Sequence, residues 1–406
     1  MAALVPFRAL RPTPASAGRV AAVPYDVVNA EEARALADGN LLSFLHVSRP
    51  EIDLPSGTTP YADAVYAKAA ENFAKLKAEA PLVVEDAPRL YVYRLRMGSH
   101  VQTGVAASYS VDEYDRDVIK KHERTRRDKE DDRTRHMLAL RAQTGPVFLT
   151  YRGTAAIDAA VRAASAAAPL FDVTAADGIQ HTLWMVPAAA QAALINGFAA
   201  LPALYIADGH HRAASAARAR QALREQNAGA AGEWDTFMAV AFPHDQMQIL
   251  PYNRVIKDLN ERTPDNLLAE LRKMYTVVEG PPAPARRGDV SMFLAGRWYT
   301  VTLGAPPPQA AAADALDVSR LQETVLGPLL GIGDVRSDRR IDFVGGARGS
   351  AELERLVNSG SAAVAFAMYP VSIDDLMAIS DAGGIMPPKS TWFEPKLRDG
   401  LLSHVI

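Results

Sequence analysis

The sequence predicts an α/β protein, because apolar strand-like segments alternate with alanine-rich helical segments through the middle of the chain. Residues 147–151, 182–186 and 204–206 are short apolar runs of the kind that form buried strands. The chain has 406 residues, 49% of them hydrophobic, which is enough to bury a substantial core. Its length is that of two or three domains or of one elaborated fold.

Ahead of this middle part, the sequence predicts one long helix and one hairpin. Apolar residues recur at helical spacing across 59–80, so we expect a helix that packs one face on the core. Residues 89–97 alternate as a strand does, and 101–109 is the expected partner strand after a Gly-Ser turn. The charge-rich run 112–141 follows, and on pattern alone it is typical of a solvated helix with i,i+4 ion pairs such as Glu123 with Arg127.

The second half of the chain continues the alternation of strands and helices. We expect a strand at 235–242, a helix at 264–274 and a hairpin whose flanking loops are rich in proline and alanine. The hairpin strands are 290–294 and 298–302, and the later elements are a helix at 319–326, a strand at 341–344, a helix at 351–358, a strand at 362–369 and a helix at 372–380. These boundaries predict an N-terminal segment 1–88 packed on a core 89–257, and a C-terminal α/β region 258–406 whose last loop returns to the core.

Composition excludes several classes of protein. The net charge of −3 provides no general attraction to nucleic acid or to a membrane surface. The chain has no cysteine, which excludes disulfides, thiolate catalysis and cysteine-ligated metals and is compatible with a reducing compartment. Prolines and arginines interrupt the N-terminus, so it lacks the apolar core of a secretion signal, and no window approaches the roughly 18 apolar residues of a membrane span. We therefore expect a cytoplasmic protein.

The most informative motif is Asp208-Gly-His-His-Arg212, which follows an apolar strand-like segment and opens a helical stretch. Gly209 permits close backbone approach, Arg212 offers a fork of donors to a phosphate, and the two histidines can donate to phosphoryl oxygens or move protons. The N-terminus of the helix adds about half a positive charge at the same place. The pattern predicts an anion-binding site, and the structural alternative is an ordinary helix with Asp208 as its N-cap.

The pair His122-Glu123, within the charge-rich run, is the second candidate. Phosphoryl transfer to a hydroxyl needs a group that orients the hydroxyl and accepts its proton. Glu123 can be that base. Spacing alone does not distinguish it from the other acidic residues nearby, which are Glu113, Glu130, Asp131 and Asp132.

The third candidate is the run 386–396 near the C-terminus. Prolines on both sides of Lys389-Ser390-Thr391 restrict the loop, and a rigid loop with one cation and two hydroxyls can clamp a small molecule. The alternative is a packed tail anchored by Trp392 and Phe393. A glycine-rich turn at 345–349, also ahead of a helix, is a weaker candidate for a phosphate loop.

Together the three motifs resemble two known groups of proteins. The chain is identified as a member of the bacterial family called domain of unknown function 1015, whose members share a KHE-x-T segment, the DGHHR turn and a terminal MPPKSTWF-x-PKL. That resemblance extends from Pro24 to Leu397. The chain is also similar to the free L-serine kinases of the ParB/sulfiredoxin-like superfamily, which carry a His-Glu pair, a DGHHR turn and a Pro-Lys-Thr-Thr loop in the same order.

The similarity to the serine kinases implies a fold and a set of roles. It implies a ParB/sulfiredoxin-like core sheet in 89–257, elaborated by N-terminal and C-terminal α/β segments. It implies a phosphotransferase for free L-serine, with ATP, ADP or pyrophosphate as the donor and Mg²⁺ as the cofactor. Catalysis then falls to Glu123, His122 and Asp208, phosphate binding to Gly209, His210, His211 and Arg212, and acceptor binding to Lys389, Ser390 and Thr391.

The sequence departs from the serine kinases at particular places. The gap between Glu123 and Asp208 is much longer here, and Trp392 and Phe393 stand where those kinases have a polar pair. Ser215 occupies a position where alanine is common. The longer gap bears on the shape of the donor pocket, and Trp392 and Phe393 bear on the identity of the acceptor.

Two other functions use the same motifs. A phosphoserine phosphatase needs the same substrate contacts, with Glu123 activating water in place of serine. A nucleotide-binding ParB-like regulatory module is the other alternative, and against it stand the acidic balance and the absence of a basic tract. In each case the expected partners are small molecules, namely serine or phosphoserine and a nucleotide, rather than nucleic acid or membrane. The residues leave the donor, the direction of transfer and the oligomeric state open.

Overall fold

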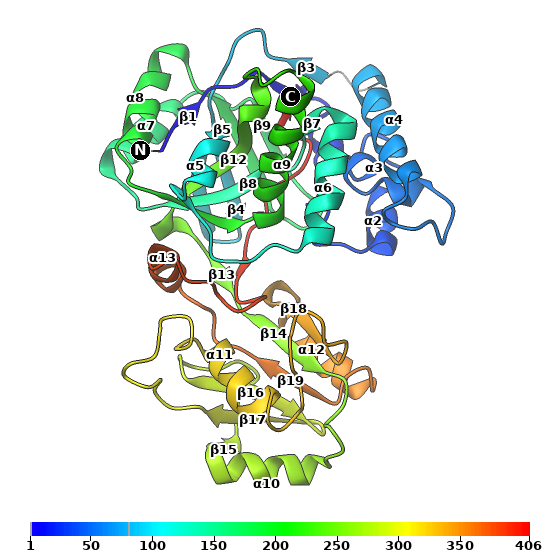
Figure 1. The fold of residues 1–406 in the computed structure, drawn as a ribbon, viewed down its shortest axis with the longest axis vertical. Helices are drawn as coiled ribbons and strands as arrows, with labels where there is room; N and C mark the ends of the chain where they lie inside the picture. Colours follow the sequence, from blue (N-terminus) through cyan, green and yellow to red (C-terminus); the bar gives the residue numbers. More distant parts are fainter. Residues whose placement is uncertain (1, 80–81) are drawn as a thin grey trace. The chain divides into compact units, whose positions relative to one another are not determined.

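The computed structural model describes residues 2–79 and 82–406, whose ribbon is shown in Figure 1. Contacts within the chain define two compact units. The first unit contains the chain up to Lys121, Thr125–Met247 and Pro395–Ile406, and the second contains His122–Arg124 and Gln248–Glu394. Both are mixed α/β, the class that the sequence predicts.

A mixed sheet of nine strands forms the centre of the first unit, in the order β6-β11-β8-β12-β5-β4-β10-β9 with β1 on β5. Two neighbouring pairs are parallel, β6 with β11 and β8 with β12, and the other pairs are antiparallel. The strands are β1 (Leu4–Val5), β4 (Tyr91–Met97), β5 (His100–Ser110), β6 (Ile119–Lys120), β8 (Val147–Tyr151), β9 (Phe171–Thr174), β10 (Gln180–Met185), β11 (Leu204–Asp208) and β12 (Thr236–Pro243).

A smaller sheet joins the two ends of the chain within the first unit. Its order is β3-β2-β21-β7, made from β3 (Leu82–Val84), β2 (Ala9–Pro12), β21 (Ser403–Val405) and β7 (Ala142–Gln143). The backbones of Ala22 and Asp399 add two hydrogen bonds, of 3.1 and 2.9 Å. The C-terminal segment 395–406 is therefore fixed beside the N-terminal strand, an arrangement that the sequence did not predict.

The helices of the first unit differ from expectation mainly in the charge-rich run. The expected single helix over 112–141 is wrong: the run forms a short helix, a two-residue strand and a second helix that begins only at Arg127. The helix expected at 59–80 is α4 (Asp63–Glu79), and its last expected residue lies outside the described residues. The other helices are α1 (Ala17–Val20), α2 (Ala30–Ala37), α3 (Leu45–Ser48), η1 (Pro50–Asp53), α5 (Val111–Asp115), α6 (Arg127–Leu140), α7 (Ala155–Ala164), α8 (Ala188–Ala199), α9 (His210–Gln226), η2 (Glu233–Asp235) and η3 (His244–Gln246).

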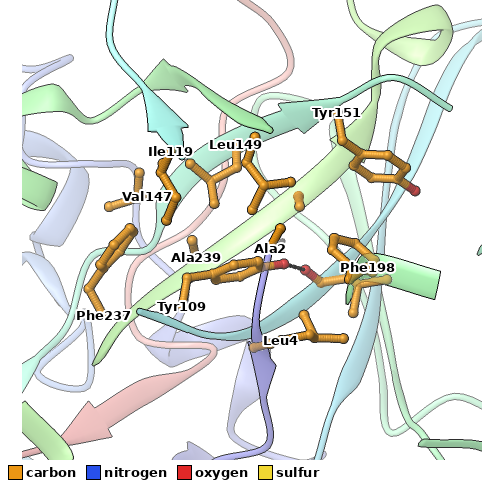
Figure 2. Close-up of a cluster of buried hydrophobic side chains, with 14 of the residues drawn as sticks. Ala2, Leu4, Tyr109, Ile119, Val147, Leu149, Tyr151, Phe198, Phe237 and Ala239 are labelled. Atoms are coloured by element: carbon orange, nitrogen blue, oxygen red, sulfur yellow. Dashed lines mark hydrogen bonds between the residues drawn. The ribbon is translucent and has the colours of Figure 1, made fainter. Parts of the chain in front are cut away.

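The main core lies between the large sheet and its covering helices, and Figure 2 shows part of it. Tyr109 of β5, Tyr151 of β8 and Phe198 of α8 are fully buried, and the Tyr151 and Phe198 rings lie 5.0 Å apart. The Tyr109 hydroxyl donates to the Val105 carbonyl at 3.0 Å, which satisfies its polar atom inside the core. The apolar strands that the sequence predicts therefore form the sheet side of this core.

Gly104 of β5 provides a test of how tightly these strands pack. A Cβ at this position would lie 2.5 Å from the Ala241 carbonyl oxygen and 2.8 Å from the Phe242 ring. Because β5 is hydrogen-bonded on both sides, we expect Gly104→Ala to lower the free energy of unfolding by about 1–3 kcal/mol, measured by urea denaturation. Gly18→Ala in α1 is the control, since the nearest atom there is 3.5 Å away. Equal midpoints for the two variants would contradict the packing.

The second unit has its own sheet of six strands, in the order β15-β17-β16-β19-β14-β18. The predicted helix 264–274 and the predicted hairpin are both present, whereas the helix expected at 319–326 becomes a π-helix after Leu321. No helix in the described parts of the chain is long and apolar enough to cross a membrane. The elements are β13 (Ile249–Leu250), β14 (Tyr252–Ile256), α10 (Pro264–Met274), β15 (Thr276–Glu279), β16 (Asp289–Leu294), β17 (Arg297–Thr302), α11 (Asp317–Leu321), η4 (Gln322–Leu326), β18 (Ile341–Gly345), η5 (Gly346–Arg348), α12 (Gly349–Asn358), β19 (Val364–Ala367), α13 (Ile373–Asp381) and β20 (Trp392–Phe393).

Candidate functional site

The turn between β11 and α9 carries the Asp208–Arg212 motif. Gly209 separates the strand from the helix and has a φ of 94°, a left-handed conformation that favours glycine. A Cβ on Gly209 would lie 3.0 Å from Nε of Arg212, so the absence of a side chain also leaves room for the guanidinium. The first amides of α9 have no intrahelical acceptor, as in any helix, and they begin at this turn. The turn therefore has the helix amides on which the predicted anion site depends, and anion binding itself stays a prediction.

Arg212 lies beneath this turn, and its guanidinium contacts acceptors inside the first unit. Its side chain is 6% exposed, and Nη1 donates to the Pro146 carbonyl. Nη2 lies 3.5 Å from an Asp208 oxygen and 3.8 Å from an Asp26 oxygen. Burial opposes the charge, but these two carboxylates outweigh it and raise the pKa of Arg212 above its ordinary value. The guanidinium thus places positive charge under the turn, and direct phosphate binding by Arg212 stays a prediction.

Asp208 accepts two hydrogen bonds at the end of β11. Oδ1 accepts from the Gly209 amide at 2.8 Å, and Oδ2 accepts from the Lys396 ammonium group at 3.0 Å. Burial alone would raise the pKa of this carboxyl, but Lys396 and then Arg212 lower it below its ordinary value. The N-cap residue of α9 is Gly209, with no side-chain cap. The ordinary helix capped by Asp208 is therefore not what the sequence forms.

The two histidines of the motif occupy the first two positions of α9. His210 is 4% exposed, which removes the alternative that both imidazoles lie on the surface. Nε2 of His211 accepts a hydrogen bond from the Arg126 amide at 3.0 Å. Because Nε2 accepts this hydrogen bond, it carries no proton. The proton of neutral His211 therefore lies on Nδ1. This bond ties the start of α6 to the start of α9.

His122 and Glu123 lie in the short connection between β6 and α6. Glu123 is therefore not on a helix, and the expected i,i+4 pair with Arg127 on one helix face is wrong. The contacts of 122–124 assign them to the second unit, where the His122 carbonyl accepts from the Met386 amide at 2.8 Å. The predicted base thus lies in the same unit as the predicted acceptor loop and is linked to it by this backbone bond.

The other acidic residues of the charge-rich run have structural partners within the first unit. Glu113 accepts from the Ala3 amide, and Asp132 accepts from the Tyr66 hydroxyl at 2.9 Å. Arg218 pairs with both Glu130 and Asp131. These contacts give four of the five candidate carboxylates a role in packing, a distinction that spacing did not provide.

The loop with Lys389, Ser390 and Thr391 is held within the second unit by its backbone. The Lys389 carbonyl accepts from Nη2 of Arg254 at 3.1 Å, and Lys389 has a φ of 58°. The Ser390 hydroxyl donates to the Pro387 carbonyl at 2.6 Å. Arg254 is 4% exposed, and burial lowers its pKa to about 10. The loop is therefore ordered by a buried cation.

Trp392 and Phe393 follow this loop as strand β20. They pair with β13, and Phe393 is 1% exposed, so the packed-anchor interpretation holds for these two residues. A Cβ on Gly345 would lie 2.6 Å from the Trp392 indole. Packing against Trp392 therefore accounts for one glycine of the 345–349 turn, the weaker candidate for a phosphate loop.

Sequence reasoning gave no role to two residues of the C-terminal segment. Lys396 lies against Asp208, as described above. Asp399 lies near Arg212, because a Cβ on Gly145 would be 3.2 Å from Oδ1 of Asp399 and 3.3 Å from Cδ of Arg212. Lys396 is the second-last residue of the MPPKSTWF-x-PKL motif, and this motif was the only signal available for it. Asp399 carried no signal, because its neighbours are distant in the sequence.

Comparisons with known proteins place this chain in a family. The model for "Protein of unknown function (DUF1015)" matches residues 4–319, so the loop 386–396 lies beyond the matched span. No curated protein matches the chain. Among solved structures, the chain is similar to a conserved hypothetical protein from Pyrococcus furiosus, with 13% identity, coverage of 74% of this chain and 95% of that chain, and a TM-score of 0.35.

Two further solved structures are similar to the same degree. A free serine kinase in complex with AMP has 13% identity over 74% of this chain and 91% of that chain, with a TM-score of 0.35. SbnI with a C-terminal truncation, from Staphylococcus aureus, has 12% identity over 74% of this chain and 87% of that chain, with a TM-score of 0.34. The family is shown by the sequence match, and this chain belongs to the DUF1015 family of proteins of unknown function.

Proposed function

We propose that this protein is a phosphotransferase that moves a phosphoryl group between a nucleotide or pyrophosphate and the hydroxyl of free L-serine. In the forward direction the serine oxygen forms a bond to phosphorus while the bond from phosphorus to the leaving phosphate oxygen breaks. Glu123 accepts the hydroxyl proton. The products are phosphoserine and a donor shortened by one phosphate.

The phosphate side of the proposal is supported by the turn at Asp208–Arg212. Gly209 has no side chain, so a ligand can approach the backbone closely at the point where α9 begins. The buried guanidinium of Arg212 adds a fixed positive charge beneath the turn. Such preorganised charge stabilises a transferring phosphoryl group without reorganisation during the reaction. In this proposal His210 and His211 supply further donors at the start of the helix.

The observation that carries the proposal is the parallel pairing of β6 with β11. Leu204 pairs with Ile119 and Tyr205 with Lys120, so both strands run in the same direction and end at the same edge of the sheet. The pair His122-Glu123 directly follows β6, and the DGHHR turn directly follows β11. The Arg126 amide, on the far side of Glu123 in the sequence, donates to His211. These features support Glu123 as the base that acts with this turn.

The proposed acceptor side is the loop with Lys389, Ser390 and Thr391. Its support is the hydrogen bond from the Met386 amide to the His122 carbonyl, which links the start of that loop to the residue before Glu123. A loop that holds serine must be placed against the base to about half an ångström, and rigid backbone contacts of this kind provide such placement.

Asp208 does not fit a direct ligand of Mg²⁺. The Asp208 carboxylate already faces two positive groups, the Lys396 ammonium at 3.0 Å and the Arg212 guanidinium at 3.5 Å, and both repel a further cation. We therefore derive no step through a metal held by this carboxylate. Mg²⁺ enters the proposal only as the ion that accompanies the phosphates of the donor.

The proposal includes three finer statements. The sheet of the first unit is assigned to the ParB/sulfiredoxin-like fold, with residues 89–257 as the catalytic core between the segments 1–88 and 258–406. The substrates are small molecules, and nucleic acid and membrane are not among the partners. The site of action is the cytoplasm.

A screen of donors against acceptors tests the proposal. The purified protein is incubated with Mg²⁺ and ATP, ADP or pyrophosphate, each with serine, and phosphoserine is quantified by mass spectrometry. The reverse reaction uses phosphoserine with AMP, ADP or phosphate as the acceptor. We expect phosphoserine to form with at least one donor, and threonine to be the matched control acceptor.

The other outcomes identify the alternatives. Release of phosphate from phosphoserine without any acceptor would identify a phosphatase. Nucleotide binding and DNA association with no turnover would identify a regulatory module. Either result would overturn the transferase assignment.

A further inference from the structure

Lys396 lies at the turn Asp208–Arg212, although the function proposed above gives this lysine no role. Its Nζ is 3.0 Å from Oδ2 of Asp208, and its side chain is 10% exposed. It belongs to the segment 395–406, which is part of the first unit together with the turn. The C-terminal segment therefore places an ammonium group within hydrogen-bond distance of the residue at which the turn begins.

The backbone that carries Lys396 is fixed on several sides. Strand β21 pairs with β2 and β7, and Asp399 and Ala22 exchange two backbone hydrogen bonds. Arg398 forms an ion pair with Asp177, and its side chain is 3% exposed. A cation held in this way loses little conformational freedom when a ligand binds, which is the condition for an efficient anion contact.

Two side-chain cations lie at this turn. Nη1 of Arg212 donates to the Pro146 carbonyl and Nη2 faces Asp208 and Asp26, whereas the buried Nε has no hydrogen-bond partner among the described residues. An ammonium group has three donors in a tetrahedral arrangement, so Lys396 can hold Asp208 and a phosphoryl oxygen at the same time. Lys396 can therefore contact the ligand beside Arg212.

We infer that Lys396 is a phosphate-binding residue of this site, whose ammonium group contacts a phosphoryl oxygen of a polyphosphate donor while Asp208 holds it in position. Asp208 is then a positioning residue. The inference rests on the proposed function, because it takes the turn at Asp208–Arg212 to be the seat of the donor phosphates.

Titration calorimetry with ADP and Mg²⁺ tests the inference. Loss of one charge-assisted hydrogen bond is expected to weaken ADP binding by about 10–100-fold in Lys396→Met. Lys68→Met is the matched control, because Lys68 also has a carboxylate partner at 3.0 Å, Glu71, but lies in α4. The control is expected to bind ADP as the wild type does.

A double variant keeps the test independent of folding. Lys396→Met leaves the buried Asp208 carboxylate with one cation fewer, whereas Asp208→Asn combined with Lys396→Met removes both charges. The double variant is expected to melt cooperatively and still to bind ADP about 10-fold or more weakly than the wild type. Wild-type affinity in a folded double variant would overturn the role of Lys396 while leaving the proposed function intact. Failure of the wild type to bind any polyphosphate would instead refute the proposed function.

Discussion

Glu123→Gln is expected to lower the rate of phosphoserine formation by about two to four orders of magnitude, the usual contribution of a general base. Glutamine has the same shape as glutamate but cannot take the proton of the serine hydroxyl. The donor phosphates are assigned to the turn after β11, so ADP binding is expected to stay within a few-fold of the wild type. Initial rates and calorimetry on the same preparation measure the two quantities.

Glu130→Gln is the matched control for this experiment. Glu130 lies in the same charge-rich run, and its carboxylate pairs with Arg218 at 3.3 Å and accepts from the Thr125 hydroxyl. Its role in the structure is packing, so this variant is expected to retain most of the wild-type turnover. Wild-type turnover in Glu123→Gln, or an equal loss in both variants, would remove Glu123 as the base.

Local signals in the sequence predicted the elements that depend on near neighbours. The helix at 264–274 was predicted to the residue, because Thr263 caps it, Pro264 begins it and leucines recur on one face. The turn at Gly209 was predicted for the same kind of reason, since a strand, a glycine and a helix former adjoin one another. The mixed α/β class follows from many such segments taken together.

Elements that depend on distant neighbours were not predicted. Strands β2 and β21 are three or four residues long and pair across almost the whole chain, with Ala9 opposite His404. No periodicity can be recognised in so few residues. The charge-rich run was expected to be one helix because its composition is helix-forming, but pairing of Ile119 and Lys120 with β11 interrupts it.

The candidate site shows the same division between local and distant information. Its motifs and their order were visible in the sequence, whereas the partners of each side chain were not. Arg212 was expected to point at a phosphate, yet Nη1 donates to the Pro146 carbonyl and Nη2 lies 3.8 Å from an Asp26 oxygen, and only folding brings these two residues to it. Lys396 contacts Asp208 across 188 positions of the sequence for the same reason.

Asp399 makes the stability of the protein depend on pH near neutrality. Its side chain is 2% exposed, and Oδ1 has no hydrogen-bond partner among the described residues. Burial, with repulsion from Asp26, raises the pKa of this carboxyl to about 7, even though Arg212, Arg133 and Arg398 favour its charged form. In the unfolded chain the same carboxyl has its ordinary value of 3.8.

The sign of the effect follows from these two pKa values. Between pH 3.8 and about 7 the folded protein holds a proton that the unfolded chain releases, so stability falls as the pH rises and then levels off. The difference of about three pKa units corresponds to at most about 4 kcal/mol above pH 7. Burial lowers the pKa of His136 to about 3, which reduces stability as the pH falls, so the wild-type curve alone contains opposing contributions.

Asp399→Asn isolates the contribution of Asp399, because asparagine imitates the protonated carboxyl at every pH. Relative to the wild type, this variant is expected to gain stability progressively from pH 4 to pH 8, by up to about 4 kcal/mol, and to match the wild type near pH 4. Urea denaturation at three or four pH values measures this difference in stability. His136 is present in both proteins, so its contribution cancels.

Asp86→Asn, at a side chain that is 89% exposed, is the control and is expected to show no such trend. A stability difference that is the same at pH 4.5 and pH 8 would show that Asp399 is charged throughout this range, in which case its charge is fully compensated by Arg212 and the neighbouring arginines.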